Sequence, residues 1–424
     1  MIKKVYERFG ETVYEIKLKN GMRVHILPKE EPYFTTYVEL SIPFGALDLN
    51  YQSENGSILT PYGTAHFLEH KIFAMPDGDA FSQFSILGVD ANAMTSYNQT
   101  SYLYTATENV LPALDHLFHM IDTPYFNDEN VEQEKHIIAE ELKMYLDDPN
   151  VVMQNQIMEM MYHVHPLKYD IGGTLESIMD VTPELLLDVY QRFYLPSNRL
   201  VTIAGKVDLK ALQAFFKTYD QTYPIKDKKP RTIYPKEPKR LVTKYIVETK
   251  DIGIDKLMIG VKLTPAKKSN REQIKKEMAI SMLLNILLGP SSLMYAELLE
   301  HKLINQSFSI NTTFEKQAEN ILIFAETKRV QKLKKILIEI LTVKALELVT
   351  KEAFDRYKKV YLGQFIFALN NLETKAYLYG KYFHMGSSLF EVVDILKEID
   401  YHNILLEIQG IQKKYISVLV HKKA

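Results

Sequence analysis

Short segments in the first half of the chain alternate hydrophobic and polar residues, and this period of two is typical of half-buried strands. Asn20-Gly21 separates two such segments and indicates a hairpin. Longer segments repeat their hydrophobic residues with the helical period of 3.6. We expect strands at Val13–Leu18, Arg23–Pro28, Thr36–Ile42, Ala91–Ser96, Ser101–Thr107 and Leu200–Ala204. We expect helices near residues 64–75 and at Val110–Asp122, Asn127–Asp147, Pro183–Phe193 and Asp208–Tyr219.

The same order of strands and helices recurs in the second half. Strands are expected at Val242–Glu248, Lys256–Leu263, Ser307–Thr313, Ile321–Glu326 and Ile416–Val420, with a long helix at Glu272–Leu288 and further helices to about Gln409. Between the halves, residues 225–240 hold three prolines and many charges, which favours a linker. The pattern predicts an α+β protein with two similar domains, residues 1–224 and 241–424, that arose by duplication.

Composition narrows the class of protein. A chain of 424 residues is too long for one ordinary core, and 46% hydrophobic with 25% charged residues is typical of globular proteins. The net charge of -2 gives no reason to expect nucleic-acid binding, and no apolar run approaches the ~18 residues of a membrane span. No hydrophobic signal segment follows Met1. The absence of cysteine suits a reducing cytoplasm, so we expect a cytoplasmic protein.

The densest group of chemically useful residues is His66-Phe67-Leu68-Glu69-His70. Helix positions three and four apart lie on one face, so both imidazoles can reach one ion while Glu69 reaches a water beside it. The order His-x-x-Glu-His is the inverzincin zinc motif. Thr64 is the expected N-cap of this helix. Burying these side chains unpaired among apolar neighbours would be costly, which favours a metal site. The apolar neighbours are Ala65, Phe67, Leu68, Ile72 and Phe73.

A third protein ligand is expected, because catalytic zinc usually has three and keeps a fourth position for water. With no cysteine, it must be a histidine or a carboxylate. The helix predicted at residues 127–147 offers Glu132, Glu134, Glu140 and Glu141. Glu134 and Glu141 share one face because seven residues separate them, whereas Glu140 lies roughly 100° away. We therefore predict Glu141 as the ligand and Glu134 as its support; the alternative is an ordinary solvated acidic face.

Several segments together carry the pattern of a known family. Gly63–Phe73 contains the zinc motif, and Glu141 follows His70 at a distance of 71 residues (141 minus 70). Asn92–Ser96 matches an edge strand, and Glu134-x6-Glu141 matches a distal-glutamate helix. Further matches are His165-Pro166, Gly173-Thr174 and Tyr194-x-Pro196-Ser197-Asn198. Together these segments resemble the pitrilysin, insulin-degrading enzyme and mitochondrial processing peptidase family.

The resemblance implies two homologous α/β-roll domains, antiparallel-rich sheets packed by helices, that form one half of a clamshell around peptides. It implies a zinc-dependent endopeptidase of a bacterial half-length branch, with one Zn²⁺ per chain. His66, His70 and Glu141 would hold the zinc. Glu69 would act as the general base for the water that zinc activates, and Glu134 would support catalysis. Substrate main chain would pair with the edge strand at Asn92, Ala93 and Met94.

One departure from the family concerns the second half. Active members supply an Arg and a Tyr there to hold the substrate carbonyl, but the matching segment Glu297–Phe308 contains neither. Losing one such donor typically costs on the order of 10² to 10³ in rate. We therefore expect a heterodimer, in which a homologous subunit without the zinc motif supplies both residues. The alternatives are a homodimer and a non-catalytic scaffold subunit of the same fold.

Overall fold

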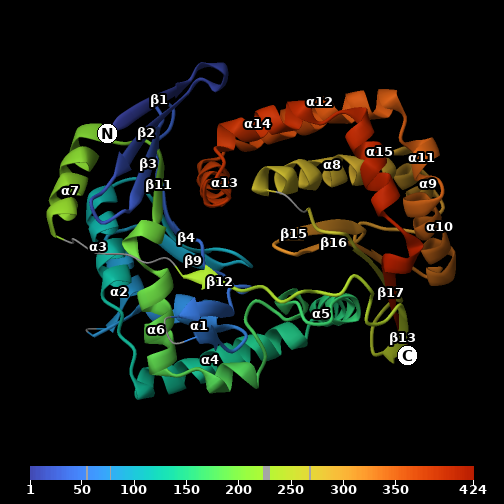
Figure 1. The fold of residues 1–424 in the computed structure, drawn as a ribbon, viewed down its shortest axis with the longest axis horizontal. Coiled ribbons are helices and arrows are strands. Elements are labelled where there is room, and N and C mark those ends of the chain that lie inside the picture. The colour runs from blue at the N-terminus through green and yellow to red at the C-terminus, as the bar shows by residue number, and fades with distance from the viewer. Residues whose placement is uncertain (54–55, 77, 223–229, 267–268) are drawn as a thin grey trace. The chain divides into compact units, whose positions relative to one another are not determined.

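The larger sheet contains seven strands in the order β1-β2-β3-β11-β4-β10-β9 (Figure 1). The computed structural model describes residues 1–53, 56–76, 78–222, 230–266 and 269–424. In this sheet only the β3–β11 pair is parallel. The strands are β1 (Ile2–Tyr6), β2 (Glu11–Lys17), β3 (Arg23–Pro28), β4 (Thr36–Ile42), β9 (Asp90–Thr95), β10 (Thr100–Ala106) and β11 (Leu200–Gly205). The last position in this order makes β9 an edge strand.

Helices cover one face of the sheet and enclose the hydrophobic core. Successive residues of a strand point to opposite faces, so Val38, Leu40 and Ile42 of β4 all lie in this core. Phe67 and Leu68 of the zinc-motif helix are fully buried in it. The core helices are α1 (Thr64–Ile72), α2 (Ala80–Ile86), α3 (Val110–Asp122), α4 (Asp128–Leu146), α6 (Pro183–Phe193) and α7 (Leu209–Thr222). The zinc-motif helix is thereby held from one side by core packing.

The other face of the sheet is polar, and α13 (Leu372–His384) lies against β4 and β11 there. A Cβ at Gly380 would lie 3.1 Å from Ser41 Oγ, so glycine allows the helix to approach the strand closely. Ser41 Oγ is also 2.9 Å from His384 Nε2. Two strand positions away, Glu39 Oε1 accepts hydrogen bonds from Ser101 Oγ at 2.7 Å and Gln99 Nε2 at 3.2 Å. Every residue of β4 is buried because both faces are covered.

A second sheet, of five strands, repeats part of the topology of the seven-stranded sheet. Its order is β13-β17-β14-β16-β15, with a parallel first pair and antiparallel pairs after it, as in β3-β11-β4-β10-β9. The strands are β13 (Tyr245–Lys250), β14 (Lys256–Lys262), β15 (Ser309–Glu315), β16 (Ala318–Glu326) and β17 (Ile416–Lys423). Helices α5 (Pro149–Met161) and α8 (Asn270–Leu288) belong to the same compact part of the chain as this sheet. The α+β fold class predicted from the sequence, with two similar domains, is confirmed.

Shorter strands and further helices complete the fold. They are β5 (Asn50–Ser53), β6 (Gly56–Leu59), β7 (Ala74–Met75), β8 (Gly78–Asp79), β12 (Arg231–Thr232), α9 (Leu293–Glu300), α10 (Val330–Thr342), α11 (Ala345–Leu348), α12 (Lys351–Ala368), α14 (Leu389–Glu398) and α15 (Tyr401–Gly410). Within the described ranges, no single helix is long and apolar enough to cross a membrane; α8 and α9 meet that criterion only as a pair bent by 44°.

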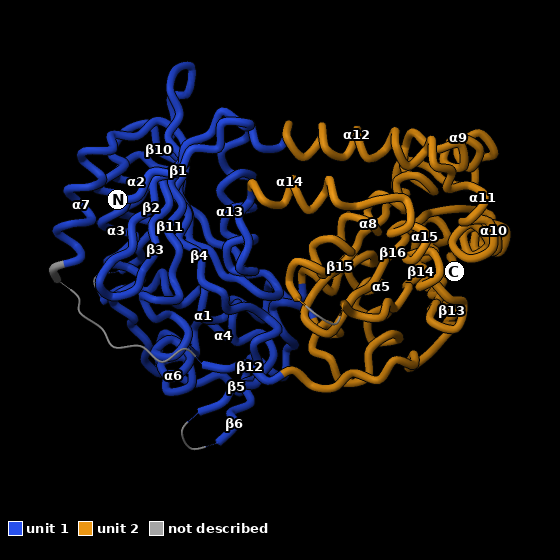
Figure 2. The backbone as a smooth tube through the Cα atoms, turned by 45° about the horizontal axis from the view of Figure 1, so that its top comes forward, with its two compact units in different colours: residues 1–143, 170–233, 368–389 blue, residues 144–169, 234–367, 390–424 orange. Residues whose placement is uncertain are grey.

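The chain folds into two compact units, and each unit contains segments from both halves of the sequence (Figure 2). Helix α5 packs on β14 and β17, although it precedes the second half of the sequence, while α13 from that half packs on β4 and β11. Periodicity shows that a helix has a buried face but does not show which sheet buries it. Unit 1 comprises Met1–Lys143, Asp170–Ile233 and Ala368–Leu389, and unit 2 comprises Met144–Tyr169, Tyr234–Phe367 and Phe390–Ala424.

The predicted division into residues 1–224, a linker and residues 241–424 therefore differs from these compact units. It remains a prediction about the duplicated segments. Part of it, residues 223–229, lies outside the described residues, whereas the rest of the predicted linker includes the short strand β12.

Glu39→Gln is expected to weaken the dependence of stability on pH. Burial raises the pKa of Glu39 from its ordinary value of 4.5 to about 7. Between these values the unfolded chain releases the proton while the folded chain keeps it, so the free energy of unfolding falls as pH rises, by roughly 3 kcal/mol in total. The variant keeps an acceptor for Ser101 and cannot ionise. Its urea midpoint should therefore vary less between pH 4.5 and 7; equal variation in both proteins would contradict this account.

Candidate metal centre

Helix α1 carries two of the three predicted ligands. Its N-cap is Gly63 with φ of 85°, and no side chain caps the helix. The expectation that Thr64 is the N-cap is wrong: Thr64 is the first residue of the helix, and its hydroxyl donates instead to Pro61 O at 2.8 Å. The helix nevertheless places His66 and His70 on one face, with ring centroids 4.6 Å apart.

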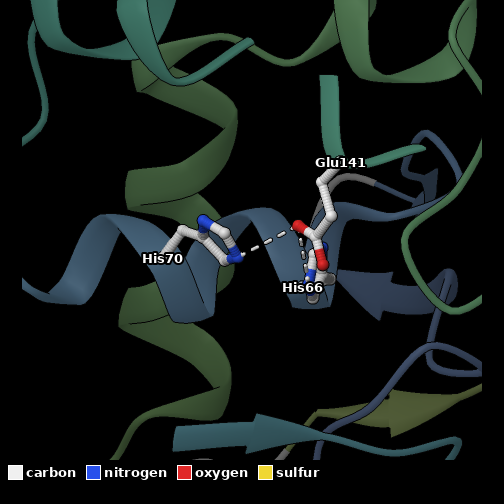
Figure 3. Close-up of side chains that lie close together, drawn as sticks. All are labelled: His66, His70 and Glu141. Atoms are coloured by element: carbon white, nitrogen blue, oxygen red, sulfur yellow. Dashed lines mark ion pairs between the residues drawn. The ribbon is translucent and has the colours of Figure 1, made fainter. Parts of the chain in front are cut away.

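Glu141 of α4 faces both histidines (Figure 3). Its Oε2 lies 3.8 Å from His66 Nε2 and 3.7 Å from His70 Nε2. All three donor atoms lie within 4.8 Å of one another. Ligand atoms about 2.0–2.2 Å from a tetrahedral zinc are themselves roughly 3.3–3.6 Å apart. The separations of 3.7 and 3.8 Å are slightly wider, so small side-chain shifts would give the spacing of a metal site.

The chemistry of the donors also fits zinc. Burial lowers the pKa of His66 to about 4, so this imidazole is neutral at pH 7 and can act as a ligand. Two imidazoles and one carboxylate form a set found in catalytic zinc sites. His66, His70 and Glu141 could therefore hold Zn²⁺.

Glu134, two turns before Glu141 on α4, orients His70 from behind. Its Oε1 accepts a hydrogen bond from His70 Nδ1 at 3.0 Å, which fixes the proton on Nδ1 and leaves Nε2 free to face Glu141. Burial raises the pKa of Glu134, but the hydrogen bond from His70 and the charge of Lys71 outweigh it, so the pKa lies below its usual value. Ionised Glu134 thus favours the ligand tautomer of His70.

Glu69 lies beside this group without belonging to it. Thr95 Oγ1, at the end of β9, donates to Glu69 Oε2 at 2.6 Å. Burial raises the pKa of Glu69, and the hydrogen bond from Thr95 opposes that shift. A carboxylate whose pKa is raised is a better proton acceptor at neutral pH than an ordinary glutamate.

A cavity of about 550 Å³ opens next to Glu69 and His70. Asn92 and Ala93 of the edge strand line it, together with the aromatic rings of Phe73 and Phe81, which stack 4.2 Å apart. Met94, the third residue predicted to bind substrate, is on the same strand but does not line this cavity. The cavity gives a peptide room beside both the edge strand and the candidate base.

The loop that contains Gly172 and Gly173 packs closely against the start of α1. A Cβ at Gly63 would lie 2.2 Å from Gly172 O, and a Cβ at Gly173 would lie 2.4 Å from Tyr62 O, so only glycine fits at these positions. Gly172 itself borders His66, since a Cβ there would lie 3.6 Å from His66 Nδ1. This Nδ1 is buried with no hydrogen-bond partner among the described residues. The loop therefore closes one side of the ligand group.

The structure brings the predicted ligands and both predicted carboxylates together, and it adds two residues that sequence reasoning missed. Thr95 was assigned only to a strand, and Lys71 only to the surroundings of the motif. The signal for Lys71 was available: a lysine within a predicted buried helix requires a partner for its charge. Thr95 had no comparable signal, because its contact with Glu69 depends on how β9 lies beside α1.

Comparisons with known proteins identify the family. The model named Insulinase (Peptidase family M16) matches residues 54–175, and the Peptidase M16 inactive domain model matches residues 180–361. The uncharacterised zinc protease YmfH of Bacillus subtilis is 36% identical over 420 residues, and the match covers 96% of each chain. The chain belongs to peptidase family M16. This result confirms the resemblance found in the sequence, since both family models and the relatives named as zinc proteases belong to the same family.

Solved structures agree with this M16 assignment. A structure from Alicyclobacillus acidocaldarius, described as an M16-like peptidase, matches with a TM-score of 0.92, 26% identity and complete coverage of both chains. The periplasmic protease PqqL of Escherichia coli matches with a TM-score of 0.75 and 17% identity, a likeness that shows the fold alone. The match covers 97% of the chain described here but only 47% of PqqL.

Proposed function

We propose that this chain is the zinc-binding catalytic subunit of an endopeptidase. The observation that carries the proposal is the group of His66, His70 and Glu141, whose donor atoms lie within 4.8 Å of one another. Glu69 lies beside the group, and Glu134 orients one of its ligands. Relatives named as zinc proteases support the same assignment. A protein that acted only as a scaffold would gain nothing from this combination.

Zinc bound there would supply a Lewis acid that polarises a carbonyl and lowers the pKa of water. The chain's own residues would do the rest. Glu69 takes the proton of the attacking water and later gives it to the departing amine. The hydroxyl of Thr95 holds Glu69 Oε2, so Oε1 would be the oxygen that takes the proton. Glu134 keeps His70 in one tautomer throughout.

The edge strand β9 would bind the substrate main chain. Asn92, Ala93 and Met94 lie on this strand, whose outer side has no neighbour within the seven-stranded sheet. An extended peptide added to this edge would be recognised by its backbone, with specificity left to pockets such as the 550 Å³ cavity. This mode predicts broad tolerance of peptide sequence.

A second, homologous subunit would complete the active site. Glu297–Phe308, which covers the end of α9 and the loop after it, contains no Arg or Tyr to hold a substrate carbonyl. PqqL is long enough to hold two folds of this size in one chain, which supports pairing. We therefore propose a heterodimer with a homologue that lacks the zinc motif. The same missing residues favour the second candidate function, a non-catalytic scaffold subunit.

Glu69→Gln is expected to keep zinc and lose peptide cleavage. The amide preserves the size of the side chain and can accept the hydrogen bond from Thr95, but it cannot take a proton. The cleavage rate should fall by about 10² to 10⁴, the usual contribution of a general base. Glu140→Gln, at an exposed position of α4, is the matched control and should cleave normally. Normal cleavage by Glu69→Gln would refute the role of Glu69.

Peptidase activity is expected to need the second subunit. The chain should be assayed with a quenched fluorescent peptide, alone and after coexpression with a homologue that has the Arg and Tyr but no zinc motif. We expect the pair to exceed this chain alone by on the order of 10² or more in rate, because oxyanion donors contribute that much. Equal activity of the chain alone would exclude the heterodimer. Zinc binding without activity in either sample would favour the scaffold.

A further inference from the structure

Lys71 is a buried cation next to the candidate metal centre. It directly follows His70 on α1, and its side chain is only 4% exposed. Its Nζ donates to Glu134 Oε2 at 3.4 Å and to the backbone carbonyl of Asn130 at 3.1 Å. Lys71 also lines the cavity beside Glu69. Neither the zinc binding nor the proton transfer proposed above uses this lysine.

The two partners of Lys71 both lie on α4. Asn130 and Glu134 are one turn apart on that helix, so a single ammonium group contacts two consecutive turns. Helix α1 carries two of the candidate ligands, and α4 carries the third. The contacts of Lys71 therefore join the two helices whose relative position sets the distances among the three donor atoms.

The two oxygens of Glu134 have different partners. Oε1 accepts from His70 Nδ1, while Oε2 accepts from Lys71 Nζ. A carboxylate held at one oxygen by a fixed cation can no longer rotate freely about its last bond. The other oxygen is then presented in one direction, toward the imidazole. Without the lysine, Glu134 would keep one partner, and the His70 ring would lose part of its orientation.

We propose that Lys71 is a positioning residue of the metal centre, which clamps Glu134 so that His70 presents Nε2 to the zinc. The proposal rests on the proposed function, because it assumes that His66, His70 and Glu141 bind zinc. It assigns the lysine no contact with the metal or with substrate. The orientation of His70 depends on Lys71 through Glu134, and this dependence makes the proposal testable.

The test is a double-mutant cycle read out by zinc affinity of the full chain, measured in competition with a chromophoric chelator. Lys71→Met removes the cation and keeps the apolar stem, and Glu134→Gln removes the charged acceptor. Each is expected to weaken zinc binding about tenfold or more, as is usual for residues behind a metal ligand. The double variant should be no weaker than Glu134→Gln alone, because Lys71 acts through that residue.

A spectrum of the cobalt(II)-loaded protein adds a readout of ligand geometry. Lys71→Met should shift the cobalt bands in the same direction as Glu134→Gln. Lys135→Met is the matched control, because Lys135 is a buried lysine on α4 that pairs with Glu132 and not with Glu134. It should bind zinc like the wild type. Should Lys71→Met fail to fold, Lys71→Leu, which likewise has neither the charge nor an N–H donor, takes its place in the cycle.

Three results would overturn the proposal: unchanged zinc affinity in the Lys71 variant, independent and additive losses in the double variant, or an equal loss in Lys135→Met. These outcomes differ from failure of the proposed function. If the wild-type chain itself bound no zinc, the metal centre would be refuted, whereas wild-type binding with an unaffected Lys71 variant would refute the clamp alone.

Discussion

The hydrogen bond between Glu134 and His70 links the two helices that carry the candidate metal ligands. The residues come from α1 and α4, and the bond joins them at 3.0 Å. Because an imidazole has two nitrogens, an acceptor on Nδ1 decides where Nε2 points. Glu141 lies two turns further along α4, so the same helix that orients His70 also delivers the third donor. The candidate metal centre is thus a consequence of how α4 lies against α1.

Different kinds of contact hold α1 and α4 in place. α1 is embedded in the core through Phe67 and Leu68, and glycine contacts fix its first turn. α4 is more exposed and shows large apolar side chains such as Ile137 and Met144 to the surface. α4 nevertheless buries Val131, Ile138 and Leu142 in the core, and the contacts from His70 and Lys71 join it directly to α1.

Much of the fold could be predicted from local sequence. Strands β3 and β4 and helices α3 and α6 have the predicted bounds, because strong periodicity or a Thr-Pro start defines them. Helix α5 was missed: the predicted helix ends at Asp147, but the next residue, Asp148, caps a second helix, with its side chain accepting from Asn150 N. Strand β1 was missed because its exposed residues have little hydrophobic pattern.

The candidate site also has a part that local sequence predicts and a part that it does not. His66, Glu69 and His70 follow from one helical face, and Glu141 follows from its spacing relative to Glu134. The contacts of Lys71 and Thr95 depend on which elements lie next to each other, and local periodicity carries no such information. The packing of α5 and α13 on their sheets likewise depends on which elements meet in space, so local periodicity does not predict it. Sequence therefore predicts the donors of the site better than the residues that hold them.

The most direct test of the account is the zinc content of the purified full chain and of two neighbouring variants on α4. Glu141→Gln alters a candidate ligand, whereas Glu140→Gln alters an exposed glutamate that pairs with Lys143. After dialysis against a weak chelator, elemental analysis should find about one zinc per chain in the wild type and in Glu140→Gln, and much less in Glu141→Gln. Absence of zinc from the wild type, or equal zinc in both variants, would contradict the proposed metal centre.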